Sequence, residues 1–109
     1  GRGLVLGALV RERRLAREVA LALAVGDHAG LDQLETRVLR RLPTSHHAPL
    51  DWVADQLGMA RLGLARRDLG GPEPVALNLI LAEAEGVAME MGAPALAARA
   101  AQIRCEAGR

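Results

Sequence analysis

The chain has 109 residues, enough for one domain with a real core, and its formal net charge is +1. Ala and Leu together fill 40 positions, whereas Phe and Tyr are absent and Trp52 is the single aromatic residue. Because strands favour aromatic and β-branched side chains, this composition excludes an ordinary sheet and predicts an all-α bundle of closely packed helices. The nearly neutral charge gives no support to nucleic-acid binding, although all 14 basic residues are Arg.

Two helices are expected in the first part of the chain. Apolar residues recur at three- and four-residue steps from Leu4 to Val25, and again from Leu31 to Leu42. Gly26 and the following Asp27 are expected to form the turn between these helices. Pro43 is expected to end the second helix, so that residues 43–49 form a loop.

Four shorter helices are expected after this loop. Asp51 can cap the first of them, and Gly58 is expected to break it. The sequence Gly-Gly-Pro-Glu-Pro at residues 70–74 is a second strong break, and Gly92 is a third. The predicted helices cover residues 51–57, 61–69, 75–91 and 94–106. The prediction is therefore a single domain over residues 1–109, a compact bundle of about six short helices.

Residues 50–69 have the pattern of a helix-turn-helix. Ala54 is small enough for two helices to cross closely, and Gly58, four positions later, tolerates the positive φ of a tight turn. The helix after the turn could then lie in the major groove of DNA. This predicts Arg61 and Arg66 as base-reading residues and Arg67 as a phosphate contact. Leu62 and Ala65 complete the predicted DNA-binding face, and Arg40 or Arg41 could contact the DNA backbone.

The same stretch matches a family pattern, Val-Ala-x-x-Leu-Gly-Met-Ser-x-x-x-Leu-x-Arg-x-Leu, at Val53, Ala54, Leu57, Gly58, Met59, Leu64 and Arg66. On these residues it resembles the DNA-binding domain of AraC/XylS-type transcriptional regulators, in a degenerate or shortened form. The resemblance implies a transcription regulator with two helix-turn-helix units, the second and weaker one at about residues 83–103. Ala60 stands where the family has Ser, and Gly63 lies inside the predicted recognition helix.

A helical-repeat module for protein–protein interaction is the alternative. The Val-Ala pairs that precede Gly58 and Gly92 lie 34 residues apart, which is the period of tetratricopeptide repeats. The Ala-rich residues 95–101 also resemble the ends of such arrays in bacterial signalling ATPases. The register opposes this reading, because residues 70–74 would then fall inside a helix that their prolines would break.

No catalytic or metal-binding pattern stands out, so we expect neither an enzyme nor a cofactor or metal. His46 and His47 are adjacent and would point about 100° apart on a helix. Cys105 is alone, which excludes an internal disulfide. The apolar run at residues 3–10 is too short to span a bilayer, so we expect a cytoplasmic protein without a membrane partner. Double-stranded DNA is the expected partner, and a homodimer or a protein partner stays open.

Overall fold

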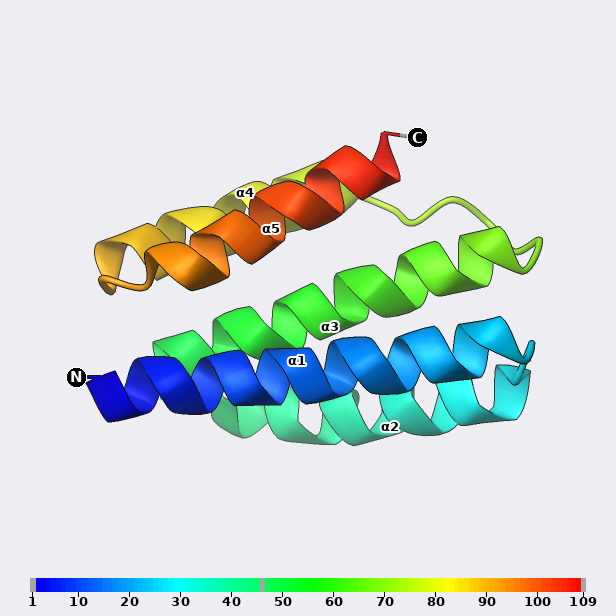
Figure 1. The fold of residues 1–109 in the computed structure, drawn as a ribbon, viewed down its shortest axis with the longest axis horizontal. Coiled ribbons are helices and arrows are strands. Elements are labelled where there is room, and N and C mark those ends of the chain that lie inside the picture. The colour runs from blue at the N-terminus through cyan, green and yellow to red at the C-terminus, as the bar shows by residue number, and fades with distance from the viewer. Residues whose placement is uncertain (1, 46, 109) are drawn as a thin grey trace.

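The computed structural model describes residues 2–45 and 47–108, and it places five α-helices in this part of the chain (Figure 1). They are α1 (Arg2–Ala24), α2 (His28–Ser45), α3 (Pro49–Asp68), α4 (Leu77–Glu90) and α5 (Pro94–Ala107). The described residues form no strand, which confirms the all-α prediction. The count of six helices is wrong, because residues 51–57 and 61–69 belong to one helix, α3.

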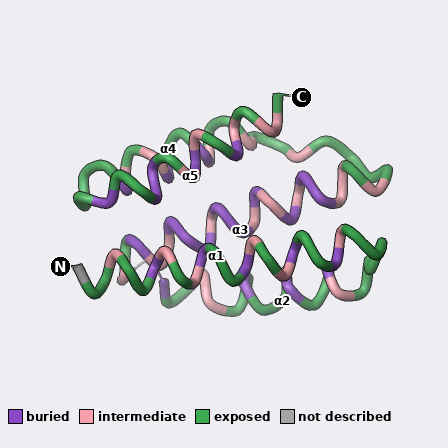
Figure 2. Tube along the Cα trace, viewed as in Figure 1, coloured by how far each residue is buried: buried purple, intermediate pink, exposed green. Residues whose placement is uncertain are grey.

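α3 lies between two helical pairs and contacts all four other helices (Figure 1). The pair α1 and α2 packs on one side of it, and the pair α4 and α5 packs on the other. Ten of the 20 residues of α3 are buried, and Figure 2 shows buried positions along most of its length. A helix that is apolar on several faces belongs in a core, and α3 is therefore the centre of the fold.

Two apolar clusters join the pairs to α3. The larger cluster packs Val53, Leu57 and Leu64 of α3 against α4 and α5, and Ala8 of α1 also belongs to it. The smaller cluster packs Leu62 and Ala65 of α3 against α1 and α2. Leu57 and Leu62 are 0% and 1% exposed. Since burying one leucine side chain contributes about 1.5–3 kcal/mol, α3 binds both pairs firmly.

The predicted turn at Gly58 is wrong, because α3 continues through this residue. Gly58 does not have a positive φ. Its missing side chain instead makes room for α1, since a Cβ built on Gly58 would lie only 1.9 Å from Cδ2 of Leu15. A glycine inside a helix costs about 1 kcal/mol relative to alanine. The close packing of α1 on α3 offsets this local cost, so tertiary contact decides the conformation.

The other predicted turns fall largely where the sequence places them. Gly26, Gly70 and Gly92 have φ values of 66°, 90° and 71°, and each lies just after a helix. This left-handed conformation favours glycine because other residues carry a Cβ that clashes there. The two segments that carry the Val-Ala pattern therefore fold differently. Gly58 is inside α3, whereas Gly92 forms the turn between α4 and α5, so residues 83–103 do not repeat the structure of residues 50–69.

The prediction that Pro43 ends the second helix is also wrong, because α2 extends to Ser45. Pro43 lies in the last turn of α2, where it removes one backbone donor, and only Thr44 and Ser45 follow it in the helix. The hydroxyl groups of Thr44 and Ser45 donate hydrogen bonds to the carbonyl oxygens of Arg41 and Leu42. The loop expected at residues 43–49 is therefore shorter, and α3 begins at Pro49.

The substitution Gly58→Ala tests the packing of α1 on α3. We expect it to lower the free energy of unfolding by about 1–3 kcal/mol, because the added Cβ overlaps Leu15. Gly7→Ala in α1 is the matched control, since nothing lies within 4 Å of a Cβ at Gly7. This control should gain up to about 1 kcal/mol from helix propensity. Urea titrations followed by circular dichroism measure both, and a stabilised Gly58→Ala variant would contradict the close contact.

Candidate functional site: an arginine-lined groove between α1 and α2

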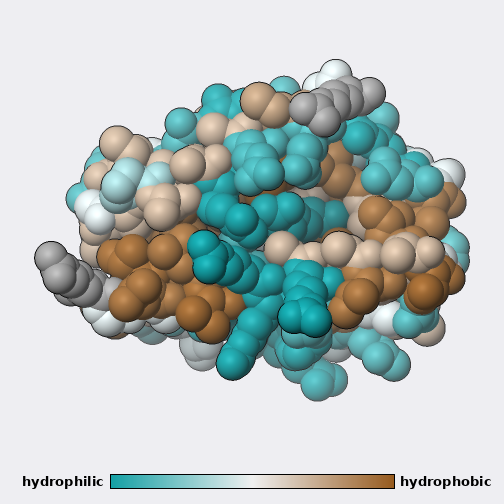
Figure 3. Space-filling model, in the orientation of Figure 1, coloured by the Kyte–Doolittle hydropathy of each residue, from teal (hydrophilic) through white to brown (hydrophobic). Residues whose placement is uncertain are grey.

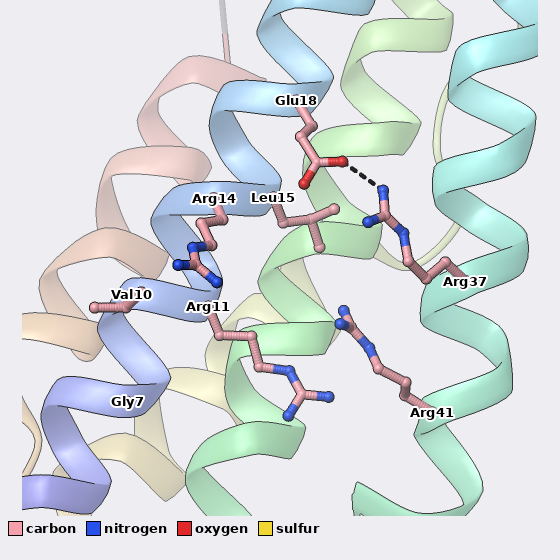
Figure 4. Close-up of a pocket in the computed structure, with 8 residues that line it drawn as sticks. All are labelled: Gly7, Val10, Arg11, Arg14, Leu15, Glu18, Arg37 and Arg41. Carbon is pink, nitrogen blue, oxygen red and sulfur yellow. Dashed lines mark hydrogen bonds and ion pairs between the residues drawn. The ribbon is translucent and has the colours of Figure 1, made fainter.

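A hollow of about 400 Å³ opens between α1 and α2 (Figure 4). Its wall contains four arginines, two from each helix, together with four other residues. The eight residues, called the arginine groove below, are Gly7, Val10, Arg11, Arg14, Leu15, Glu18, Arg37 and Arg41. A guanidinium group binds carboxylates and phosphates through two parallel hydrogen bonds. The wall is therefore suited to an acidic ligand.

Helical spacing brings these side chains together. Arg11, Arg14 and Glu18 follow one another at steps of three and four residues, which places them on one face of α1. Arg37 and Arg41 are four residues apart on α2 and face α1 across the groove (Figure 4). Figure 4 also shows the guanidinium groups of Arg11 and Arg41 extending into the space between the helices. The groove thus combines residues that are distant in the sequence.

Asp55 of α3 fixes two of the four arginines. Its carboxylate is completely buried and accepts two hydrogen bonds from Arg11, both of 3.2 Å, and one of 3.0 Å from Arg41. Burial raises the pKa of Asp55, because the loss of hydration outweighs the favourable charges of Arg11 and Arg41. Arg11 also forms an ion pair of 3.3 Å with Asp51, so two carboxylates hold the two guanidinium groups in defined positions at the groove.

The other arginines of the groove keep unused hydrogen-bond donors. Arg37 forms an exposed ion pair with Glu18. Arg14 is exposed and makes no hydrogen bond or ion pair with any residue that the structure describes. Arg41 bonds to the described residues only through Nη2, its side chain is 34% exposed, and its buried Nε has no partner among them. The exposed guanidinium group of Arg14 and the unused terminal donors of Arg41 therefore remain available to an acceptor group in the groove.

Two neighbouring hollows extend the groove along both helices. One, of about 640 Å³, lies over α2 and includes Arg37, Arg40 and Arg41. The other, of about 480 Å³, includes Arg37 again and the exposed apolar residues Leu21 and Val25. Arg37 therefore borders all three hollows, and the surface changes from basic to apolar along α1.

The residues predicted to read DNA bases are placed in packed surroundings. Arg61 donates a hydrogen bond of 2.9 Å to Glu12 of α1, and its side chain is 15% exposed. Glu12 is fully buried and also accepts a hydrogen bond of 2.6 Å from Arg99 of α5. Leu62 and Ala65 lie in the core. The exposed recognition face predicted for residues 61–67 is therefore replaced by contacts inside the bundle.

Arg66 and Arg67 are also engaged by neighbouring groups. Arg66 donates hydrogen bonds of 2.8 Å to Asp32 and 3.0 Å to Glu35 of α2, and the bond to Asp32 is the main cause that raises the pKa of Arg66. Arg67 donates a 3.0 Å hydrogen bond to the carbonyl oxygen of Ala107 and lies near Glu73. Whether any of these residues contacts DNA stays a prediction.

Sequence reasoning missed the two buried carboxylates, Glu12 and Asp55. Asp55 follows Val53 and Ala54 on the inward side of α3, and a carboxylate among apolar helix positions is a signal of a buried ion pair. Glu12 stands within the run of Arg11, Arg13 and Arg14, which reads as a solvated helix face. Nothing in that local sequence points to Arg61 and Arg99 as its partners.

The described residues contain no group of three His, Cys, Asp or Glu side chains that could hold a metal ion, and His46 lies outside them. Cys105 is an exposed free thiol. Among the described helices, none has the length and apolar character needed to cross a membrane. No family model, curated protein or solved structure matches this chain.

The buried Glu12 predicts a large effect on stability. We expect Glu12→Gln to lower the free energy of unfolding by about 3 kcal/mol, because Arg61 and Arg99 would lose their shared countercharge. Glu18→Gln removes an exposed partner of Arg37 and should cost less than about 1 kcal/mol. Chemical denaturation of both variants measures the difference. Equal losses would contradict the importance of the buried pairs.

The raised pKa of Asp55 predicts the sign of a pH dependence. The folded chain binds a proton at Asp55 more readily than the unfolded chain, whose carboxyl has its ordinary pKa of 3.8. By linkage, the contribution of Asp55 to the free energy of unfolding falls as the pH rises from 3.8 through the raised pKa. Asp55→Asn removes this titration. The stability of the wild type relative to the variant should therefore decrease across that window, and an increase with pH would refute the raised pKa.

Proposed function

We propose that the chain is an α-helical protein-interaction module whose arginine groove binds an acidic segment of a protein partner. The observation that carries this proposal is the groove itself, in which Arg14 makes no bond to any described residue and the 34% exposed side chain of Arg41 bonds to described residues only through Nη2. Asp55 holds Arg11 and Arg41 in place before a ligand arrives. Binding therefore requires little further ordering of these two side chains, which favours affinity.

Exposed apolar side chains on both sides of the arginines favour a protein ligand. Leu6 and Val10 lie toward one end of α1, and Leu21 and Val25 lie toward the other, with exposed fractions of 47–78%. Figure 3 shows two hydrophobic areas over α1 that are separated by hydrophilic side chains. A segment with acidic and apolar side chains can satisfy both kinds of surface. Buried apolar area would supply affinity, and the charges would fix the orientation of the partner.

Duplex DNA is less suited to this surface. Binding to DNA depends on many contacts between basic residues and phosphates. Here carboxylates stand among the arginines, with Glu18 in the groove wall, Asp51 beside Arg11 and Asp32 beside Arg66. The net charge of +1 adds no general attraction. DNA binding stays a prediction from the sequence, and the binding experiment described next therefore includes a DNA duplex as one of its probes.

Fluorescence anisotropy with labelled probes tests the proposal. The first probe is a synthetic amphipathic peptide that carries Leu and Glu on one helical face, the second has Lys in place of Glu, and the third is a short DNA duplex. We expect the Glu peptide to bind about tenfold more tightly than either other probe, because its carboxylates can bond to Arg14 and Arg41.

Variants locate the binding within the groove. Arg14→Gln should weaken binding of the Glu peptide about tenfold through the loss of one charged hydrogen bond, and should leave the free energy of unfolding unchanged. Gln102→Glu on the exposed surface of α5 makes the same change in net charge away from the groove and should have no effect on binding. Equal binding of the Lys peptide, or preference for the duplex, would contradict the proposal.

A further inference from the structure

α4 presents an outer face that no described part of the chain covers. Leu79 and Met89 are 74% and 59% exposed, and Ala82 and Gly86 between them are exposed as well. The four residues follow steps of three, four and three, which is the spacing of a helix–helix seam. Nothing lies within 4 Å of a Cβ built on Gly86, so another helix can approach closely there. We call these four residues the α4 stripe.

The charged residues of α4 are all negative, and one of them, Glu85, is paired with Arg104 of α5. α4 contains Glu83, Glu85 and Glu90 and no basic residue, and Glu83 and Glu90 are exposed. The exposed face of α1 has the opposite sign, with Arg13, Arg14 and Arg17 at its centre. Two α4 stripes brought together would place glutamates against glutamates, and two α1 faces would place arginines against arginines. Of these three pairings, only that of α4 with α1 brings opposite charges together.

The apolar residues of the two faces also match in spacing. Leu79 and Met89 are ten residues apart on α4, and Val10 and Leu21 are eleven residues apart on α1. At about 1.5 Å per residue, the two separations are about 15 Å and about 16.5 Å. The small residues Ala82 and Gly86 would then face the arginines at the centre of α1 and leave space for their long stems.

We propose that the α4 stripe of one molecule docks on the exposed face of α1 of a second copy of this chain. The proposal rests on the function proposed above and names α4 as the acidic, apolar segment that the α1 side binds. Within one molecule, α1 and α4 belong to pairs on opposite sides of α3, so the contact joins different molecules (Figure 1). The two surfaces differ, so each molecule keeps one free surface and the assembly can grow head to tail.

Two substitutions at exposed positions disable the two surfaces separately. Leu79→Arg places a positive charge on the α4 stripe, and Leu21→Glu places a negative charge on the α1 face. Both positions are at least 60% exposed, so the fold is expected to persist, which circular dichroism checks. Leu39→Glu on α2 is the matched control, an exposed leucine outside both surfaces.

Sedimentation velocity over a range of concentrations measures the assembly. The wild type and Leu39→Glu should form larger species as concentration rises, and added salt should weaken this growth. Leu79→Arg and Leu21→Glu should each associate at least about tenfold more weakly. An equimolar mixture of these two variants should form a two-chain species that does not grow further, because each partner supplies one intact surface.

A wild type that stays monomeric at millimolar concentration would overturn the inference. Association that both single variants retain, or a mixture that fails to form the two-chain species, would also overturn it. The peptide assay separates this result from the proposed function. A monomeric chain that still binds the Glu peptide through Arg14 overturns the α4 contact and leaves the proposed function intact. Assembly that Leu79→Arg and Leu21→Glu both weaken, in a chain that does not bind the Glu peptide, contradicts the proposed function and supports the α4 contact.

Discussion

The packing of Leu15 of α1 against Gly58 of α3 is the contact on which the rest of the structure depends. Because Gly58 has no side chain, α1 approaches α3 closely at the middle of both helices. α3 is continuous at this contact, and it presents Val53, Leu57 and Leu64 to one helical pair and Leu62 to the other. Glycine often ends a helix because of its conformational freedom. Gly58 instead lies inside α3, where Leu15 of α1 packs against it.

Two buried carboxylates link the helices that this packing brings together. Asp55 joins α3 to α1 and α2 through Arg11 and Arg41, and Glu12 joins α1 to α3 and α5 through Arg61 and Arg99. Such pairs contribute less to net stability than their geometry suggests, because each charge loses hydration. Their main effect is to orient the arginines. Asp55 holds two of the four guanidinium groups of the arginine groove, those of Arg11 and Arg41, from the side of α3.

Local sequence signals predicted the parts of the fold that depend on local chemistry. The helices at residues 4–25 and 94–106 and the turns at Gly26, Gly70 and Gly92 follow from periodicity and from glycine's access to positive φ. Gly58 carried the same local signal, and there it predicted a turn that the packing of α1 prevents. The helix-turn-helix pattern depends on Gly58 and its neighbours in the sequence. It cannot include the contact with Leu15, which lies 43 residues earlier. For the same reason the groove was not predicted, since its arginines come from two helices that meet only in the fold.

The uninterrupted course of α3 through Gly58 can be measured directly by amide hydrogen exchange at residues 53–62. In a continuous helix these backbone N–H groups are bonded within α3, so they exchange only when the whole chain unfolds. The account predicts that the amides from Gly58 to Leu62 are protected as strongly as those from Val53 to Leu57. Faster exchange confined to residues 58–61 would reveal a local break in α3, and it would contradict the structure on which both the groove and the two-sided core depend.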